Sequence, residues 1–500
     1  MSRPAATTDI ADTADTAARA SARTLRPLIV ALLVVLGLNL AFAVLTLVFQ
    51  DRILDYQVAA DPGFGQLDAT AQTRHRFFLG LTLWSRPAML VAALVIYLSV
   101  IRGLRDGRRG PYLRVRLLAG VLLALHSYLL AAHEYPPWLR FIEGAQVVAL
   151  IVLLVIARRP AIRSVYARDA ATPDPDPGRP RTGREITCLI VLTPLIAELA
   201  WGSTRFSEAW ALPLFGPAYA GAALLIRETV RRRRGLGWGS VLLFGTAYGL
   251  AEEGLALQSL TSTGMYPVAG WAPRVAGINT AYTVMVLPYH AVFSIALPIL
   301  MVDLLFPRHR RSPYLRTRGL ICSALALILG LCLMRLAAAF NDPGYQVPLP
   351  YAAAIVGLIA GCVGLALRRP APSAAPTRRT LPTPVVIALC AGAAVALYLG
   401  LLIPMPGATH SAYTEGHQQW LPLLAVPAAA AAATLAVRPF ARVDWTNAQR
   451  AALLGGALVA HTAIGLLTYP HTTTDRVGLA ALGLLEAATA VLLVRQNRAA

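Results

Sequence analysis

Two adjacent glutamates interrupt one of the apolar stretches of this sequence. Glu252 and Glu253 lie in GLAEEGLALQSL (249–260), whose other residues are apolar enough to sit in a lipid bilayer. A charged side chain at the centre of a membrane helix costs about 2.5–3.5 kcal/mol on insertion scales, so an acid at that depth is a functional candidate by default. Neighbouring side chains on a helix point about 100° apart, so each carboxylate needs its own environment. We expect these residues to act on protons, as a general base or as a proton carrier.

Two further ionisable residues fall at the same predicted depth. They are Glu198 in LTPLIAELAWGS and His290 in LPYHAVFSIALP. At about 1.5 Å of rise per residue from the predicted cytoplasmic helix ends, Glu198 lies about 20 Å deep, the glutamate pair about 21 to 23 Å and His290 about 24 Å. The candidate catalytic residues are therefore Glu198, Glu252, Glu253 and His290, in one layer of the outer half of the membrane. No cofactor is expected, and the sequence leaves open whether the layer binds a metal.

The helix that carries the glutamates has a second distinctive feature. Gly245 and Gly249 precede Glu253 at intervals of four residues, so one helix face has no side chain below the carboxylate. Small residues allow another helix or a substrate to approach closely. The loop that follows, residues 259–277, is long for a membrane hairpin and contains Arg274, so it is a candidate cap over a cavity.

Each of these residues also has a purely structural interpretation. A buried glutamate can be protonated and hydrogen-bonded to a hydroxyl group on a neighbouring helix, which only holds the bundle together. Arg227 and Glu228, at a predicted helix end, are expected to form an interfacial pair. The structural interpretation is favoured for His126, His133, His461, Glu486 and Arg335. A metal site is only weakly indicated for His410, Glu415 and His417.

Composition places the chain among polytopic membrane proteins. Of its 500 residues 56% are hydrophobic and 14% charged, and the mean hydropathy is +0.57. The net charge of +20 comes from arginines gathered in short clusters between apolar stretches, such as 231–234. That pattern predicts contact with anionic lipids at the cytoplasmic surface and no nucleic-acid partner. The use of arginine without lysine is typical of a high-GC bacterium, such as an actinobacterium.

Apolar runs of bilayer length predict an all-α, polytopic bundle of about fourteen transmembrane helices. The loops assigned to the cytoplasm hold three to seven arginines each, and those assigned outside hold one or none after the second span. This alternation predicts that both the N and C termini are cytoplasmic, in the cell membrane. The predicted spans are 28–49, 85–101, 116–133, 139–157, 185–204, 212–227, 238–258, 278–305, 319–337, 349–367, 383–403, 420–437, 449–468 and 477–494.

Proline-rich charged stretches predict the domain boundaries. Residues 168–184 (RDAATPDPDPGRPRTGR) are expected to form a cytoplasmic linker between a four-span module, 1–167, and a ten-span module, 185–500. A second such stretch, 368–384, divides the larger module into a six-span block, 185–367, and four further spans in 385–500. The six-span block contains all four candidate site residues.

A glutamate pair in a membrane helix, followed one span later by His290 with Ser294 four positions on, resembles the CAAX-protease and bacteriocin-processing (CPBP) family of intramembrane proteases. The resemblance covers at most residues 185–367. It implies that the glutamates activate a water and that the histidine helps to polarise a peptide carbonyl. The segments YGLAEEGL (248–255) and YHAVFS (289–294) are more similar to uncharacterised actinobacterial multi-pass membrane proteins, a resemblance that implies no activity.

Three functional hypotheses remain open at this stage. The first is an intramembrane hydrolase of a peptide or lipid substrate, in which Glu252 or Glu253 is the base and His290 donates to the oxyanion. The second is a proton-coupled transporter or lipid translocator, because intramembrane carboxylates and histidines also carry protons. The third is a non-catalytic membrane scaffold, which predicts a dry and tightly paired polar layer.

Overall fold

The computed structural model shows an all-α protein that divides into two compact units, residues 1–177 and 178–500. It describes residues 6–60, 64–66, 100–106, 109–132, 135–166, 182–233, 236–266, 268–368, 382–405, 445–469 and 472–496, together with single positions between 68 and 97 and at 408 and 411. The predicted linker 168–184 lies almost entirely outside these residues, so the predicted domain boundaries stay predictions.

Within the described residues, nine helices are long and apolar enough to cross a membrane. Their ranges are Arg23–Val48, Pro111–Ala131, Pro137–Arg158, Thr280–Leu305, Thr317–Asn341, Leu349–Arg368, Pro384–Leu402, Asn447–Thr468 and Thr473–Gln496. Three more predicted spans, 185–204, 212–227 and 238–258, are helical but are not among these nine. The predicted spans 85–101 and 420–437 fall mostly or wholly outside the described residues. A polytopic helical membrane protein is thus confirmed, whereas the count of fourteen and the orientation of the termini remain predictions.

In the first unit, two long helices pack against a third. Helix α1 (Ala6–Val48) and helix α4 (Arg109–Ala132) both pack against α5 (Pro137–Arg158), and the short helices α2 (Gln50–Ala60), η1 (Phe64–Gln66) and α6 (Pro160–Val165) complete the described part. Leu28, Leu104 and Leu153 are fully or almost fully buried in its core. After α6, the ring of Tyr166 stacks on Tyr112 with the ring centroids 4.5 Å apart.

The second unit begins with helices that break into π-helical turns. Its first half comprises α7 (Gly183–Pro194), η2 (Leu195–Leu199), η3 (Phe206–Ala211), α8 (Leu212–Arg232), α9 (Trp238–Gly249), η4 (Leu250–Ala256), α10 (Val268–Trp271), α11 (Thr280–Tyr289), η5 (His290–Ala296) and α12 (Leu297–Leu305). The two-residue strands β1 (Arg274–Val275) and β2 (Ile278–Asn279) pair antiparallel, with Arg274 opposite Asn279. Ala276 and Gly277 turn the chain between them with φ of 47° and 76°, a left-handed conformation that suits a tight hairpin.

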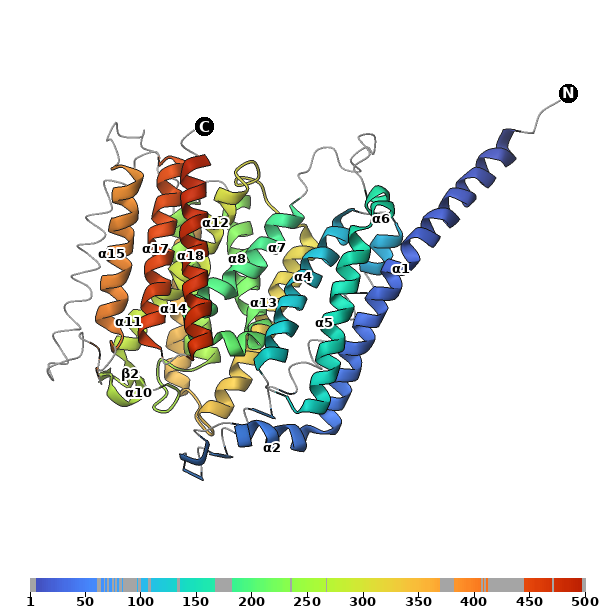
Figure 1. Cartoon of the computed structure of the whole chain (residues 1–500). Coiled ribbons are helices and arrows are strands. Elements are labelled where there is room, and N and C mark those ends of the chain that lie inside the picture. Colours follow the sequence, from blue (N-terminus) through green and yellow to red (C-terminus); the bar gives the residue numbers. More distant parts are fainter. Residues whose placement is uncertain are drawn as a thin grey trace. The chain divides into compact units, whose positions relative to one another are not determined.

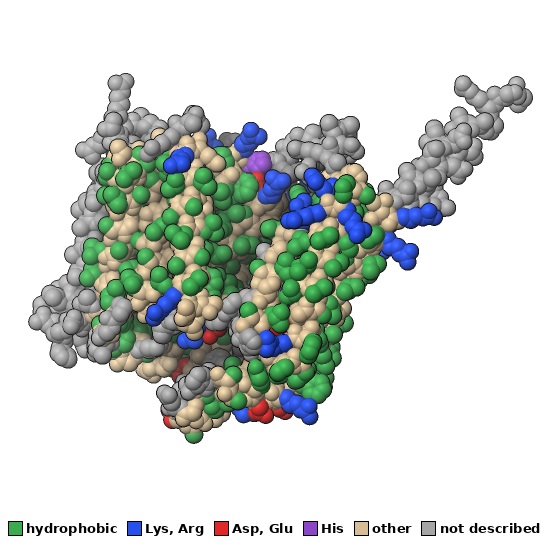
Figure 2. Space-filling view, viewed as in Figure 1, with side chains coloured by type: hydrophobic (Ala, Val, Ile, Leu, Met, Phe, Trp, Pro, Cys, Tyr) green, Lys and Arg blue, Asp and Glu red, His purple; other side chains and the backbone are tan. Residues whose placement is uncertain are grey.

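Long helices complete the second unit. They are α13 (Thr317–Asn341), α14 (Leu349–Arg368), α15 (Pro384–Leu402), α17 (Asn447–Thr468) and α18 (Thr473–Gln496), and Figure 1 shows α15, α17 and α18 side by side. Hydrophobic side chains cover the flanks of these helices in Figure 2. Leu325, Leu389 and Leu484 are 61%, 68% and 72% exposed. Such a surface is expected of helices that contact lipid chains rather than water.

Candidate functional site

All four candidate site residues lie in π-helical turns of the second unit. Glu198 belongs to η2, the glutamate pair to η4 and His290 to η5. The backbone shows the wider i to i+5 spacing: Ala200 N donates to Leu195 O at 2.8 Å, and Leu257 N donates to Glu252 O at 2.7 Å. π-Helical turns are rare and occur frequently at functional sites, because the inserted residue shifts the side chains that follow it.

His290 contacts both members of the glutamate pair. Its Nε2 lies 3.0 Å from Glu253 Oε1, and its Nδ1 lies 3.2 Å from Glu252 Oε2. The same Nδ1 is 3.0 Å from Ser294 Oγ, one turn further along η5. All three ionisable side chains are at least 95% buried. The structure therefore brings Glu252, Glu253 and His290 into one cluster, which we call the Glu–His cluster.

Glu253 is fully hydrogen-bonded within this cluster. Besides its contact with His290, its Oε2 accepts a hydrogen bond from the hydroxyl of Tyr282 at 3.1 Å and another from the hydroxyl of Ser259. Tyr282 lies on α11, and Ser259 lies just beyond the end of η4. Glu253 thus joins η5 to α11 and to the start of the loop 259–277.

Glu252 is less fully satisfied than its neighbour. Its Oε2 is close enough to His290 for an ion pair but lacks hydrogen-bond geometry with any described residue. The hydroxyl of Tyr248, one turn earlier, interacts with Glu252 electrostatically and through a weak side-chain hydrogen bond, although it lacks strict hydrogen-bond geometry with any described residue. Two buried polar groups therefore face each other with hydrogen-bonding capacity to spare, which is unusual in a protein interior.

Glu198 lies beside the Glu–His cluster instead of inside it. Its carboxylate accepts hydrogen bonds from Tyr219 at 2.5 Å, from Ser203 at 2.8 Å and from Thr204 at 3.1 Å. The ring of Tyr219 in turn stacks over the imidazole of His290, with centroids 6.3 Å apart. One tyrosine side chain thus separates this third carboxylate from the other two.

The predicted glycine face of α9 lies directly against the histidine segment. A Cβ atom built on Gly245 would lie 2.7 Å from Ala291 Cα, and one built on Gly249 would lie 3.1 Å from His290 Cβ. Any side chain at Gly245 would collide with the backbone of η5. These two glycines therefore allow the close helix contact that sets His290 beside the glutamates of η4.

Arg274 and Asn279 order the loop 259–277 and the start of the helix that follows it. The guanidinium of Arg274 donates to the backbone carbonyls of Thr261 at 3.1 Å and of Gly277 at 2.9 Å, and also to that of Ser262. Asn279 caps α11 by accepting from Tyr282 N at 3.0 Å. Arg274 therefore shapes the loop and does not reach the carboxylates; a capped cavity remains a prediction.

The remaining polar residues of the sequence analysis occupy separate places. His461 is fully buried, with Nε2 3.0 Å from the hydroxyl of Tyr289. Glu486 accepts from Thr462 at 2.8 Å, and Arg335 donates to the carbonyl of Tyr345 at 3.0 Å. His126 is buried in the first unit. Outside the described residues lie His133, His410, Glu415 and His417.

A comparison with known protein families places the chain in one of them. The model of an uncharacterised membrane protein family matches residues 187–496, which is more than half of the chain. The chain belongs to that family. No match exists among the curated proteins or among the solved structures. The matched segment contains Glu198, Glu252, Glu253 and His290.

Sequence reasoning missed the hydroxyl groups that complete the site in this family member. Tyr219, Tyr282 and Ser259 each donate to a carboxylate of the candidate site. Tyrosines and serines are common in membrane helices, and only the helix packing shows which of them face an acid. Among the described residues, no group of three or more His, Cys, Asp or Glu side chains is arranged to hold a metal ion.

Proposed function

We propose that this chain is a proton-coupled membrane transporter or lipid translocator, in which the Glu–His cluster holds and releases the coupling protons. The observation that carries the proposal is the position of His290, whose two ring nitrogens each lie within 3.2 Å of a different buried carboxylate. An imidazole in this position can take a proton on one nitrogen and release one from the other.

Charge neutrality supports a cluster that stores protons. Two carboxylates and one imidazole are neutral as a group only when they carry two acidic protons in total. Those protons can sit on the imidazole and one carboxyl group, or on both carboxyl groups. Losing one leaves a net negative charge in a buried environment, which is costly unless a cation replaces it. Proton release from this site therefore favours coupling to the movement of another species.

The surrounding hydroxyl groups extend the cluster in two directions. Tyr282 and Ser259 connect Glu253 to the outer loop, and Tyr219 connects the vicinity of His290 to Glu198. A hydroxyl group both donates and accepts hydrogen bonds, so it can take part in a chain along which protons move. Such a chain would link the cluster to the outer surface of the membrane.

The experiment compares a cluster variant with a matched buried glutamate elsewhere. The full-length chain is placed in liposomes that contain a fluorescent phosphatidylglycerol, and lipid movement and internal pH are followed under an imposed pH gradient. We expect Glu253→Gln to abolish gradient-dependent movement and to lower proton uptake. Glu486→Gln removes a buried acid whose hydrogen bond within the described part of the chain comes from Thr462, and it is expected to leave both signals unchanged. Wild-type proton uptake in Glu253→Gln would refute the proposal, whatever the substrate.

One observation favours a second function, intramembrane hydrolysis of a peptide or lipid. The Tyr248 hydroxyl and Glu252 Oε2 both lack strict hydrogen-bond geometry with the described residues, so a water or a substrate carbonyl there would find two polar partners. Glu252 would be the general base, as in the resemblance to CPBP proteases. Incubation in ¹⁸O-labelled water with a transmembrane peptide would then label a new carboxyl group. Loss of this labelling in Glu252→Ala is expected of a hydrolase, and equal labelling in that variant would exclude the idea.

The proposal also covers the location and the membrane topology of the whole chain. We propose that it lies in the cell membrane of an actinobacterium, with about fourteen spans and both termini cytoplasmic. Fluorescent-protein and alkaline-phosphatase fusions at the two termini test this orientation, because each reporter is active on one side only. A non-catalytic scaffold, the remaining alternative, predicts that neither proton uptake nor ¹⁸O labelling occurs.

A further inference from the structure

A cavity of about 200 Å³ lies at the end of the second unit where α8 and α12 end and α9 and α17 begin. It is separate from the Glu–His cluster. Four arginines contribute to its wall: Arg231, Arg310, Arg311 and Arg450. The other lining residues are Trp238, Leu300, Asp303, Leu304 and Asn447. We call this cavity the arginine pocket.

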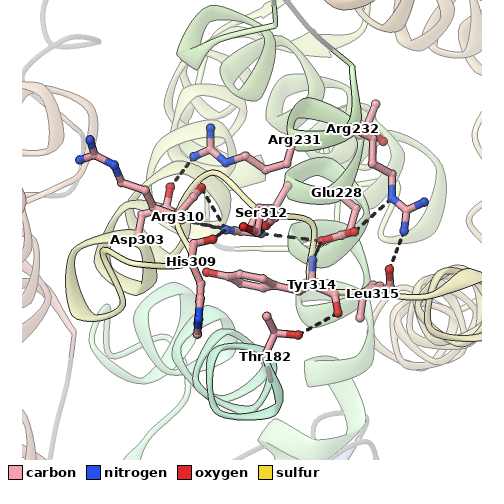
Figure 3. Close-up of polar contacts among 12 residues, drawn as sticks. Thr182, Glu228, Arg231, Arg232, Asp303, His309, Arg310, Ser312, Tyr314 and Leu315 are labelled. Carbon is pink, nitrogen blue, oxygen red and sulfur yellow. Dashed lines mark hydrogen bonds and ion pairs between the residues drawn. The ribbon is translucent and has the colours of Figure 1, made fainter. Parts of the chain in front are cut away.

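The one acid among the residues that line the arginine pocket already has its charge neutralised by ion pairs. Asp303 pairs with Arg227 at 3.1 Å and also with Arg231. Arg227 does not line the pocket, is 99% buried, and has its guanidinium 3.2 Å from the ring centroid of Tyr314. Figure 3 shows the side chain of Arg231 reaching the carboxylate of Asp303. The arginines that line the pocket therefore keep an excess of positive charge.

The loop that supplies two of these arginines is fixed by the same buried residue. Arg227 donates to the backbone carbonyls of His309, Arg310 and Ser312 at 3.2 to 3.3 Å. These bonds hold the loop between α12 and α13. The side chain of Arg310 then donates to Asn447 Oδ1 at 2.9 Å, at the first turn of α17. The arginine pocket is thus built on buried polar contacts and is not a chance cluster of surface arginines.

The charges of two guanidinium groups in the arginine pocket remain available to a ligand. Among the described residues, neither Arg310 nor Arg311 forms an ion pair with a carboxylate. Guanidinium groups bind phosphate oxygens through paired hydrogen bonds and do so more specifically than ammonium groups. Trp238, Leu300 and Leu304 add an apolar wall, and tryptophan is typical of the membrane surface.

We propose that the arginine pocket binds a phosphate-bearing anion at the membrane surface. A volume of about 200 Å³ suits a phosphate group with a small substituent and is below the usual size of a site for a larger ligand. The phosphate comes either from the headgroup of an anionic phospholipid or from a free phosphate compound. Both present the same oxygens to the same guanidinium groups.

The test uses the purified full-length chain and two phosphate probes. Inorganic phosphate is titrated in neutral detergent against chloride at equal ionic strength, and dioleoyl phosphatidylglycerol is titrated into phosphatidylcholine nanodiscs. The double variant R310A/R311A is compared with R308A, which removes one arginine of the same loop that does not line the pocket. Thermal stabilisation by each probe reports its binding. We expect R310A/R311A to bind at least about tenfold more weakly and R308A to bind as the wild type does.

Each outcome bears on the proposal. Stabilisation by phosphatidylglycerol alone identifies a lipid headgroup, and stabilisation by inorganic phosphate identifies a free anion. Wild-type binding of both probes by R310A/R311A would overturn the proposal, as would an equal loss in R308A or the absence of binding in the wild type. If the alanine variant does not fold, R310K/R311K keeps the charge but removes the guanidinium fork, and it is expected to bind with intermediate strength.

Discussion

Gly249 lies directly against His290: a Cβ on the glycine would be 3.1 Å from the histidine Cβ. The next turn of the same helix segment carries Glu252 and Glu253, which both contact the imidazole. The absence of a side chain at one position therefore determines where the two carboxylates lie relative to the histidine. This contact is the structural basis of the Glu–His cluster.

Adding one methyl group at Gly245 should disturb the site from a distance. The new Cβ would lie 2.7 Å from Ala291 Cα, so the backbone of η5 must move. We expect Gly245→Ala to lower the free energy of unfolding by about 1–3 kcal/mol, as overpacking does, and to reduce proton uptake. Thermal melting in detergent measures the first effect.

A glycine on α14 serves as the control for that substitution. Gly361 is exposed and has no atom within 4 Å of a built Cβ, so Gly361→Ala only raises helix propensity. It should be neutral or stabilising by up to about 1 kcal/mol. Equal melting temperatures for Gly245→Ala and the wild type would show that the close contact between α9 and η5 is not required.

Removing the hydroxyl of Tyr282 should take away one of the hydrogen bonds that position the carboxylate of Glu253. The phenol donates to Glu253 Oε2 at 3.1 Å, and Tyr282→Phe leaves the ring in place. We expect a loss of about 1.5–3 kcal/mol in the free energy of unfolding, the usual range for a hydrogen bond to a charged group, and a changed pH dependence of proton uptake. Tyr351→Phe is the matched control, because that hydroxyl donates only to the carbonyl of Ala276. Identical pH profiles for both variants would remove Tyr282 from the site.

The layer of ionisable residues could be expected from the sequence because helix geometry is simple. A constant rise per residue places Glu198, the glutamate pair and His290 at similar depths without any knowledge of helix packing. The depth of a residue in the membrane does not determine which neighbouring helix its side chain contacts, however. Glu198 shares the depth but is bonded to Tyr219, one side chain away from His290. Contacts around the bundle axis depend on packing that hydropathy does not encode.

The sequence also could not predict the π-helical turns or the full set of ion pairs around Arg227, because both depend on how the helices pack. Apolar helices carry little periodicity, so an extra residue in η4 or η5 leaves no mark on the pattern. Arg227 was expected to pair with Glu228, its neighbour in sequence. That pair is present at 3.7 Å, but a closer partner of Arg227 is Asp303, 76 residues later, at 3.1 Å, and Glu228 also bonds to Arg232 and to the backbone of Tyr314. Partners from distant helices require the tertiary structure.

Tyr166, in the first unit, should ionise at a higher pH than an ordinary tyrosine does. Burial and, to a smaller extent, the stacked Tyr112 raise the pKa of Tyr166 to about 12, the second because two phenolates repel each other. The neutral form is favoured in the folded state, so this contribution to stability is complete below pH 10 and is lost as the pH rises from about 10 to about 12. The difference in phenolate absorbance between the wild type and Tyr166→Phe should therefore titrate near pH 12. A midpoint near pH 10 would contradict the burial of this ring.

The ion pair between Arg227 and Asp303 should contribute strongly to the stability of the second unit. Both side chains are at least 93% buried, so removing Arg227 leaves Asp303 with Arg231 as its remaining described partner and takes the donor away from three loop carbonyls. We expect Arg227→Met to lower the free energy of unfolding by about 3–5 kcal/mol. Arg227 also fixes the loop of the arginine pocket, so this variant should bind inorganic phosphate and phosphatidylglycerol less well than the wild type does.

An exposed ion pair in the first unit provides the contrast. Arg76 and Asp55 lie 2.5 Å apart with side chains 47% and 63% exposed, and water screens their interaction. Asp55→Asn should therefore change the stability by no more than about 1 kcal/mol. The double variant Arg227→Met/Asp303→Asn should lose less than the sum of its single variants, because each substitution removes a charge whose closest described partner the other has already removed. Additive losses in this cycle, or a loss in Arg227→Met no larger than that in Asp55→Asn, would show that burial does not strengthen the pair.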